Sequence, residues 1–391
     1  MGNKIALSLS GLSSISIGRW LICLALILFM VACTGNKEES NNPNKPKISD
    51  EAGTRFFSDD QFTTNVQQLE GDTWQVQDNL AEPVVINVIK DYLFIGDKQS
   101  QQPIHIFSTT TKEYLGSIGA RGKGPNEFLS TTEFSLSPDG KIIWIYDLVL
   151  ERFQGFDLEA LSSQTLDKAF EFPYIQKVQF QAEALVGLLS KVNDSISVGS
   201  AMEGKKAIML GRNDGSLKAK MGDIPQLSPP IPENLLVRYY GYDARVAPKG
   251  NKILAFAKFC DRATLFTLET QQEVTIIGPE GFPPKKQIAD IPGMGGIAGV
   301  AKGTRGGYTD AAITQRSIYL LYSGRYNDPE ETPLEFMAAN TIYTLNHEGL
   351  PQKKLQLNEM ISGFSLDEKN QTIYGMILKE DEYDIINFSF E

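Results

Sequence analysis

Few residues of this sequence can bind a metal or form a cross-link, since only two of the 391 are His and three are Cys. Two His cannot supply a three-His metal site, and three Cys cannot form the disulfide network of a small secreted scaffold. Basic residues are also scarce, with 37 Lys and Arg against 48 Asp and Glu and a formal net charge of −11. Because affinity for nucleic acid comes mostly from Lys and Arg contacts to phosphates, nucleic acid is excluded as a partner. No metal site is predicted.

The sequence also lacks an apolar run long enough to cross a membrane. The longest run, Trp20 to Ala32, has thirteen residues, whereas a membrane span needs about 20. It follows Lys4 and Arg19 with no acidic residue before it, which is typical of a secretory signal. Met30-Val31-Ala32-Cys33 resembles a bacterial lipobox. Residues 1–32 are therefore predicted to be a lipoprotein signal peptide, and Cys33 is predicted to be lipidated and to become the mature N-terminus.

The segment after Cys33 has the composition of a tether. Between Thr34 and Asp50 the only large apolar residue is Ile48, and Asn, Lys, Glu and Pro are abundant. Such a segment cannot offset its ordering entropy by burial, so residues 33–50 are predicted to be flexible. Residues 36–39 (NKEE) resemble the short signal that directs some lipoproteins to the cell surface. We expect an outer-membrane lipoprotein of net charge −13, because the signal removes two positive charges from −11, facing the periplasm or the cell surface.

Helical periodicity is almost absent from residues 51–391, which instead form a repeat of short strand-like runs. The first copy has four runs, separated by turn residues such as Lys90-Asp91. The copies lie within residues 83–118, 132–170, 184–221, 243–277, 310–357 and 361–390, and the second ends in a faint run near Phe170. The last copy has only three runs. Repeats of this length and strand number predict an all-β, six-bladed β-propeller of four-stranded blades over residues 51–391.

The segment from Arg55 to Gln77 precedes the first copy and contains alternating apolar residues. We expect this N-terminal segment to supply the strand that the sixth blade lacks and so to close the ring. Closure would also protect an otherwise exposed sheet edge.

A motif in the second copy resembles the NHL repeat. It consists of a Gly-rich turn at Gly119–Phe128 (GARGKGPNEF), a hairpin turn at Ser137–Lys141 (SPDGK), then Asp147 and Arg152-Phe153. Together with the lipobox, it makes the mature chain similar to the TolB-like or NHL-like six-bladed propeller lipoproteins. This resemblance implies the fold and a cell-envelope location, and it implies no reaction.

The long connections of the repeat should all emerge on one face of the propeller, which we call the long-loop face. They are Gly119–Ser130, Gly222–Arg238, Gly278–Tyr308 and Ser323–Asn340. Long loops in a compact domain usually carry function. Within and next to these connections, Lys and Arg residues lie beside aromatic residues. This arrangement suits the binding of an anionic sugar, a peptide carboxylate or an acidic partner; in the alternative interpretation, the same residues form ion pairs between blades. The candidate ligand-binding residues are Arg121, Lys123, Arg238, Tyr239, Tyr240, Lys258, Arg305, Tyr308 and Arg325.

Two functional hypotheses remain open. The favoured one is a lipid-anchored, non-enzymatic binding or scaffold module for a glycan, a peptide or an envelope protein. The alternative is a carbohydrate hydrolase or lyase that uses carboxylates, or a channel that holds calcium. The Gly-rich segments 119–124 and 293–298 lack the context of a nucleotide-binding loop, so no cofactor is predicted. A hydrolase should present two carboxylates about 5 to 9.5 Å apart in a deep pocket on the long-loop face. A binding module should instead have a broad face of cations and aromatics, with its acids paired to Arg or Lys.

Overall fold

The computed structural model describes residues 53–74, 76, 80–159, 173–178, 186–291, 295–300, 302–328, 330, 332–379 and 382–391. The predicted signal peptide and tether lie outside these residues, as does the run near Phe170. No helix in the described ranges is long and apolar enough to cross a membrane.

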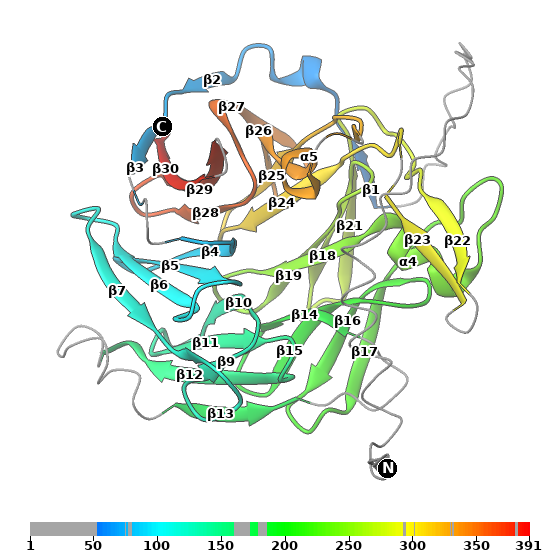
Figure 1. Cartoon of the computed structure of the whole chain (residues 1–391). Helices are drawn as coiled ribbons and strands as arrows, with labels where there is room; N and C mark the ends of the chain where they lie inside the picture. The colour runs from blue at the N-terminus through cyan, green and yellow to red at the C-terminus, as the bar shows by residue number, and fades with distance from the viewer. Residues whose placement is uncertain are drawn as a thin grey trace, which may run out of the picture.

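Six antiparallel sheets are arranged in a ring, as predicted (Figure 1). The innermost strand of each blade contacts the innermost strand of the next, and β28 contacts β4 to complete the circle. From inside to outside, blade 1 consists of β4 (Pro83–Ile89), β5 (Tyr92–Asp97), β6 (Ile104–Ser108) and β7 (Tyr114–Ile118), and blade 2 of β10 (Thr131–Leu136), β11 (Ile142–Asp147), β12 (Arg152–Asp157) and β13 (Tyr174–Lys177). Blade 3 consists of β14 (Val186–Lys191), β15 (Ile196–Ala201), β16 (Lys206–Arg212) and β17 (Leu217–Asp223), and blade 4 of β18 (Tyr242–Val246), β19 (Lys252–Ala257), β20 (Arg262–Thr267) and β21 (Gln272–Ile277). Blade 5 consists of β24 (Tyr308–Ile313), β25 (Ser317–Tyr322), β26 (Ala339–Asn346) and β27 (Pro351–Ile361), and blade 6 begins with β28 (Phe364–Asp367), β29 (Thr372–Lys379) and β30 (Glu382–Ser389).

The core lies between the blades, because each sheet buries both of its faces. In β5, Leu93, Phe94 and Ile95 are consecutive and all fully buried. Phe94 of blade 1 meets Phe134 of blade 2, with ring centroids 5.8 Å apart. Strands buried on both sides read as continuous apolar runs rather than as alternating ones. This explains the continuous apolar runs in strands such as β5.

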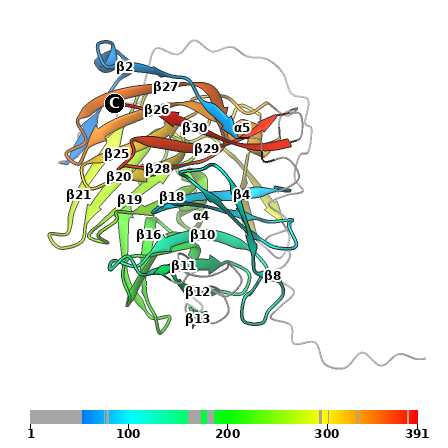
Figure 2. The ribbon, with the colours of Figure 1, turned by 90° about the vertical axis from the view of Figure 1, so that its left-hand side faces the viewer.

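The N-terminal segment closes the ring, as predicted, through β3 (Asp72–Trp74). This strand pairs antiparallel with β30 and gives blade 6 its fourth strand. The segment does more than close the ring, because β1 (Thr54–Phe56) adds parallel to β21 and β2 (Val66–Leu69) adds parallel to β27. Residues 53–74 therefore cover the outer edges of blades 4, 5 and 6 in turn, and we call them the N-terminal belt (Figures 1 and 2).

Two aromatic side chains fix the N-terminal belt to blade 5. Phe57, just before the short 3₁₀ helix η1 (Asp59–Phe62), and Phe62, its last residue, are buried. Their ring centroids lie 5.2 and 5.1 Å from that of Tyr343 on β26. Full burial of a Phe side chain contributes roughly 1.5–3 kcal/mol. These contacts help hold strands that are too short to pair stably alone.

Strand boundaries differ from the prediction at two places. The fourth strand of blade 2 is β13, which begins at Tyr174. The inner strand of the last blade begins at Phe364 rather than Ile361, because Ile361 ends the 11-residue strand β27 of the preceding blade. Ile361 adjoins the connection between blades 5 and 6, where the apolar pattern continues across the boundary.

The long connections contain small elements of their own. They are the pair β8 (Ala120–Arg121) and β9 (Glu127–Phe128), the helix α4 (Glu233–Tyr240), the hairpin β22 (Gln287–Ile291) and β23 (Gly295–Gly299), and the helix α5 (Pro333–Met337). The turns at Asp139-Gly140 and Asp214-Gly215 are tight, and both glycines have positive φ, 71° and 80°. This is the conformation for which an Asp-Gly turn is favoured.

Candidate functional site

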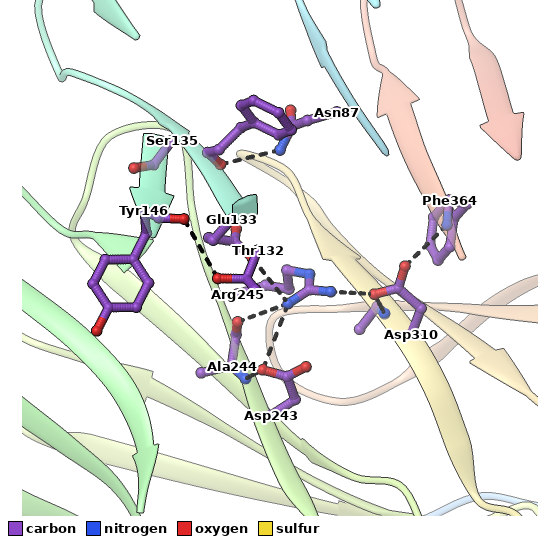
Figure 3. A network of polar contacts seen from close by, with 12 residues as sticks. Asn87, Thr132, Glu133, Ser135, Tyr146, Asp243, Ala244, Arg245, Asp310 and Phe364 are labelled. Carbon is purple, nitrogen blue, oxygen red and sulfur yellow. Dashed lines mark hydrogen bonds and ion pairs between the residues drawn. The ribbon is translucent and has the colours of Figure 1, made fainter. Parts of the chain in front are cut away.

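A charged network lies among the inner strands of the ring (Figure 3). Arg245 on β18 donates to Asp310 on β24 over 2.6 Å and lies 3.8 Å from Glu133 on β10. Asp243, two residues before Arg245 on the same strand, lies 3.7 Å from its guanidinium and 3.2 Å from the Nζ of Lys258. Arg245 therefore joins blades 2, 4 and 5 through one side chain.

Burial sets the charges in this network. Burial raises the pKa of Glu133 to about 7, although the charge of Arg245 opposes that shift. Burial would also raise the pKa of Asp243, but the charges of Lys258 and Arg245 outweigh it and lower the pKa. For Arg245 burial disfavours the charge, and the neighbouring carboxylates outweigh burial and raise its pKa. The network therefore holds at least one carboxylate and its guanidinium as a buried ion pair near neutral pH.

Arg245 occupies the place between the carboxylates where a bound cation would lie. Glu133, Asp243 and Asp310 point toward its guanidinium rather than toward an open position (Figure 3). Among the described residues, no group of three or more His, Cys, Asp or Glu side chains is arranged to hold a metal ion. Each of the three acids therefore has Arg245 within ion-pair distance. We call the charged contacts among Glu133, Asp243, Arg245, Lys258 and Asp310 the channel network.

Uncharged side chains also join the inner strands of neighbouring blades. The amide of Asn87 on β4 donates to the carbonyl of Phe134 over 3.2 Å. The hydroxyls of Ser365 and Ser135 accept from the backbone amides of Val88 and Lys191, at 2.9 and 3.2 Å. These contacts cross from one blade to the next, so they stabilise the ring.

Arg305 forms an ordered stack with aromatic residues on the long-loop face. Its guanidinium carbon lies 4.3 Å from the ring centroid of Phe282 and 5.3 Å from that of Tyr326. Its Nε donates to the carbonyl of Gly324 over 2.7 Å, and its Nη2 forms an ion pair with the carboxylate of Glu280. Tyr326 is 64% exposed. We call Tyr326, Arg305 and Phe282 the aromatic platform.

A second cation–aromatic cluster surrounds α4. Arg238 donates to the carbonyl of Met202 over 2.6 Å and pairs with Glu203 at 3.0 Å. Tyr239 is buried and donates its hydroxyl to the carbonyl of Lys286 over 2.5 Å. The Nζ of Lys286 lies 3.5 Å from the ring centroid of Phe259. These contacts hold the connection between blades 4 and 5 against the end of α4.

The other predicted site residues lie apart from one another. Tyr240 and Tyr308 are buried, and their hydroxyls donate to the carbonyls of Pro225 and Gly278. Arg121 is exposed and donates to the carbonyl of Lys98 over 2.5 Å, and Arg325 donates to the carbonyl of Glu335 over 2.8 Å. Lys123 is exposed on the same connection as Arg121. Lys258 faces Asp243 in the channel network, so it links that network to the long-loop face.

Sequence reasoning missed the channel network and the role of three buried aspartates, of which only Asp147 stood out, as part of the NHL-like motif. Asp97, Asp147 and Asp261 each accept at least three backbone amides at the connections between blades, for example those of Glu280, Gly281 and Phe282 at Asp261. These aspartates could have been found in the sequence, because copies one, two and four each have an Asp at or after the end of the second strand. The signal for the network was a charged residue inside the first run of a copy, as at Glu133, Arg245 and Asp310.

Comparison with known proteins supports the architecture. A family model described as TolB-like 6-blade propeller-like matches residues 57–369. Curated proteins give no match. Among solved structures, a member of the DUF4221 family from Bacteroides vulgatus is 11% identical with a TM-score of 0.51, covering 83% of this chain and 97% of that chain. A protein from Bacteroides fragilis classed as exported is 12% identical with a TM-score of 0.49, covering 86% of this chain and 98% of that one. At such identity the likeness concerns the fold alone.

Proposed function

The chain belongs to the TolB-like 6-blade propeller-like family, and from this premise we propose that it is a non-enzymatic binding module of the cell envelope. Its long-loop face presents the aromatic platform to a glycan, a peptide or another envelope protein. The observation that carries this proposal is the exposure of Tyr326 above a fixed arginine. A large aromatic residue held in place offers contact area at a small entropic cost, and Tyr and Arg dominate binding hot spots.

The surroundings of Arg305 support a prearranged platform. Glu280 accepts from both Arg305 and the hydroxyl of Tyr322, the latter over 2.7 Å. Burial would lower the pKa of Arg305, but the hydrogen bond to Glu280 and the nearby charges together outweigh burial, so the net shift of the pKa is upward and the guanidinium stays charged. A guanidinium fixed in this way is a stable base against which Tyr326 can stack. A partner would therefore bind with little reordering of the platform.

The surroundings of the buried acids argue against the hydrolase alternative. A glycosidase needs one carboxyl group as an acid and a second as a base or nucleophile. In the channel, Glu133, Asp243 and Asp310 share the charge of Arg245. Asp97, Asp147 and Asp261 are fully or almost fully buried. None of these six acids combines exposure with a free carboxylate.

The envelope location rests on the sequence alone. The apolar run Trp20–Ala32 and the lipobox-like Met30–Cys33 support export and lipidation at Cys33. The belt begins at Gly53, so about twenty residues separate Cys33 from the first described residue of the propeller. This length would let the long-loop face reach partners away from the membrane surface.

Tyr326→Ala is the direct test of the platform. Pull-downs from detergent-solubilised envelopes should recover a partner with the wild type and lose it, or bind it about tenfold more weakly, with the variant. The matched control is Tyr174→Ala, because Tyr174 is 56% exposed but lies on the outermost strand of blade 2. Identical partner lists for wild type and Tyr326→Ala, with unchanged thermal unfolding, would remove the platform from the proposal.

A further inference from the structure

The connection that carries Tyr326 is acidic, although the cations beside aromatics on the long-loop face suggested an anionic partner. This connection joins β25 to β26, and residues 323–338 contain three Glu and one Asp against a single Arg. Asp328 and Glu330 follow Tyr326 by two and four residues, and both are exposed. Glu335 in α5 is exposed as well. The segment on which the exposed ring is mounted therefore carries a net negative charge.

The basic residues at the platform are already engaged, whereas its acids are available to a partner. The guanidinium of Arg305 forms an ion pair with Glu280, and Arg325 donates to a backbone carbonyl over 2.8 Å. Asp328 accepts from the backbone amide of Glu330 over 3.1 Å. Among the described residues, neither of these two carboxylates has a Lys or Arg within ion-pair distance. The charge that is free to meet a partner is therefore negative.

An exposed lysine defines a competing explanation, in which the platform binds an anion. Lys302 lies on the neighbouring connection, three residues before Arg305. The charge of Arg305 is offset by its own ion pair, so it adds little to the attraction for an anion. One exposed cation is thus set against three exposed carboxylates, those of Asp328, Glu330 and Glu335. This balance favours a cationic ligand.

Backbone contacts on both sides hold Tyr326 in position. Tyr326 and Arg305 form an isolated antiparallel bridge between the two connections. Hydrogen bonds flank this bridge, one from the amide of Asn327 to the carbonyl of Thr304 over 2.7 Å and the other from the amide of Gly306 over 2.8 Å. The guanidinium of Arg305 lies over the ring, yet Tyr326 remains 64% exposed. A second planar group can therefore stack on the exposed part of the ring with little reordering.

We propose that the aromatic platform binds an arginine side chain in a basic segment of an envelope protein, an inference that rests on the proposed binding function. The guanidinium would stack on the exposed part of the Tyr326 ring, and the carboxylates of Asp328 and Glu330 would attract its charge. Arginine is favoured over lysine because its planar group stacks on aromatics and pairs with carboxylates through two hydrogen bonds. The expected ligand is thus basic, opposite in charge to the one that Arg305 and its neighbours suggested in the sequence.

Peptide binding to the full chain in detergent tests the charge of the ligand. Fluorescence anisotropy would compare three labelled peptides of one design, in which Gly and Ser spacers surround Arg, Lys or Glu residues. The Arg peptide should bind about tenfold more tightly than the Glu peptide, and added salt should weaken its binding. Tyr326→Ala should weaken binding of the Arg peptide about tenfold. Tyr326→Phe should keep most of the binding, because it keeps the ring.

Matched charge variants test the acids separately from the ring. The double variant Asp328→Asn/Glu330→Gln should weaken binding of the Arg peptide about threefold and reduce its dependence on salt. The control is Asp91→Asn/Glu348→Gln, which removes the same charge from exposed turns between β4 and β5 and between β26 and β27. These turns lie on the face opposite the long connections, so the control should bind the Arg peptide like the wild type.

Three results would overturn the basic-ligand proposal: no binding of the Arg peptide, equal binding of the Glu peptide, or binding that Tyr326→Ala does not change. The envelope pull-down decides the proposed function separately, because a partner retained by the wild type and lost from Tyr326→Ala would still support a binding module. If that retained material survives digestion with proteinase K, the ligand is not a protein segment, and the basic-ligand proposal is wrong.

Discussion

At the scale of single residues, the channel network makes a prediction about pH. The pKa of Glu133 is raised from 4.5 to about 7 in the folded chain. A raised pKa means that the folded state binds the proton more tightly, so this stabilisation is complete below about pH 4.5 and is lost as the pH rises through about 7. Glu133→Gln should therefore be the more stable protein at pH 8, by up to about 3 kcal/mol.

Urea unfolding at several pH values would measure this effect. The difference in unfolding free energy between Glu133→Gln and wild type should grow between pH 4.5 and pH 7 and then stay constant. Glu348→Gln, in an exposed turn, is the control and should show no such trend. A difference that does not change with pH would mean that folding leaves the pKa of Glu133 unshifted, because the charge of Arg245 offsets burial.

At the scale of elements, the closing strand β3 depends on one side chain. Trp74 is buried, donates its indole N–H to the side chain of Asn387 over 2.7 Å, and meets Tyr374 edge to face at 5.6 Å. Trp74→Ala should lower the unfolding free energy by about 3–5 kcal/mol, as large truncations of buried aromatics do. Trp74→Phe should lower the unfolding free energy by less. Loss of the hydrogen bond to Asn387 should account for about 1 kcal/mol, in addition to the effect of the smaller ring on packing.

A control for β3 comes from the neighbouring strand of the N-terminal belt. Val66 on β2 is 43% exposed, so Val66→Ala should change the unfolding free energy by no more than about 0.5 kcal/mol. Equal effects of Trp74→Ala and Val66→Ala in the same urea titration would show that β3 does not hold blade 6 closed.

The elements also show how far the sequence could predict the structure. Blade 1 has four strands and runs from Pro83 to Ile118, as predicted, because turn residues such as Lys90 separate clear apolar runs. β1 and β2 were not separately predictable, since strands of three and four residues with exposed positions carry no clear pattern. The platform was only partly predictable: Arg305 was a predicted site residue, but its stacking with Tyr326 joins two different connections, which no local pattern encodes.

At the scale of the whole molecule, the proposed lipid anchor at Cys33 makes a prediction about location. Cys33→Ser should move the protein from the detergent phase to the aqueous phase in a Triton X-114 partition of cells, because the proposed site of lipid attachment is gone. Cys23→Ser, inside the predicted signal, and Cys260→Ser, at a buried position, should leave the partition unchanged. Retention of the Cys33→Ser protein in the detergent phase would exclude this cysteine as the anchor.

The N-terminal belt has a mechanical consequence for a propeller held by its N-terminus. Tension applied at Gly53 reaches β1 first, then β2, and only then β3. Detachment of β1 and β2 leaves the four-stranded sheets of blades 4 and 5 complete, since both strands are additions to the outer edge. Only the loss of β3 removes a strand from a blade. Under tension, β1 and then β2 would therefore detach in two short steps before the force separates β3 and opens the ring.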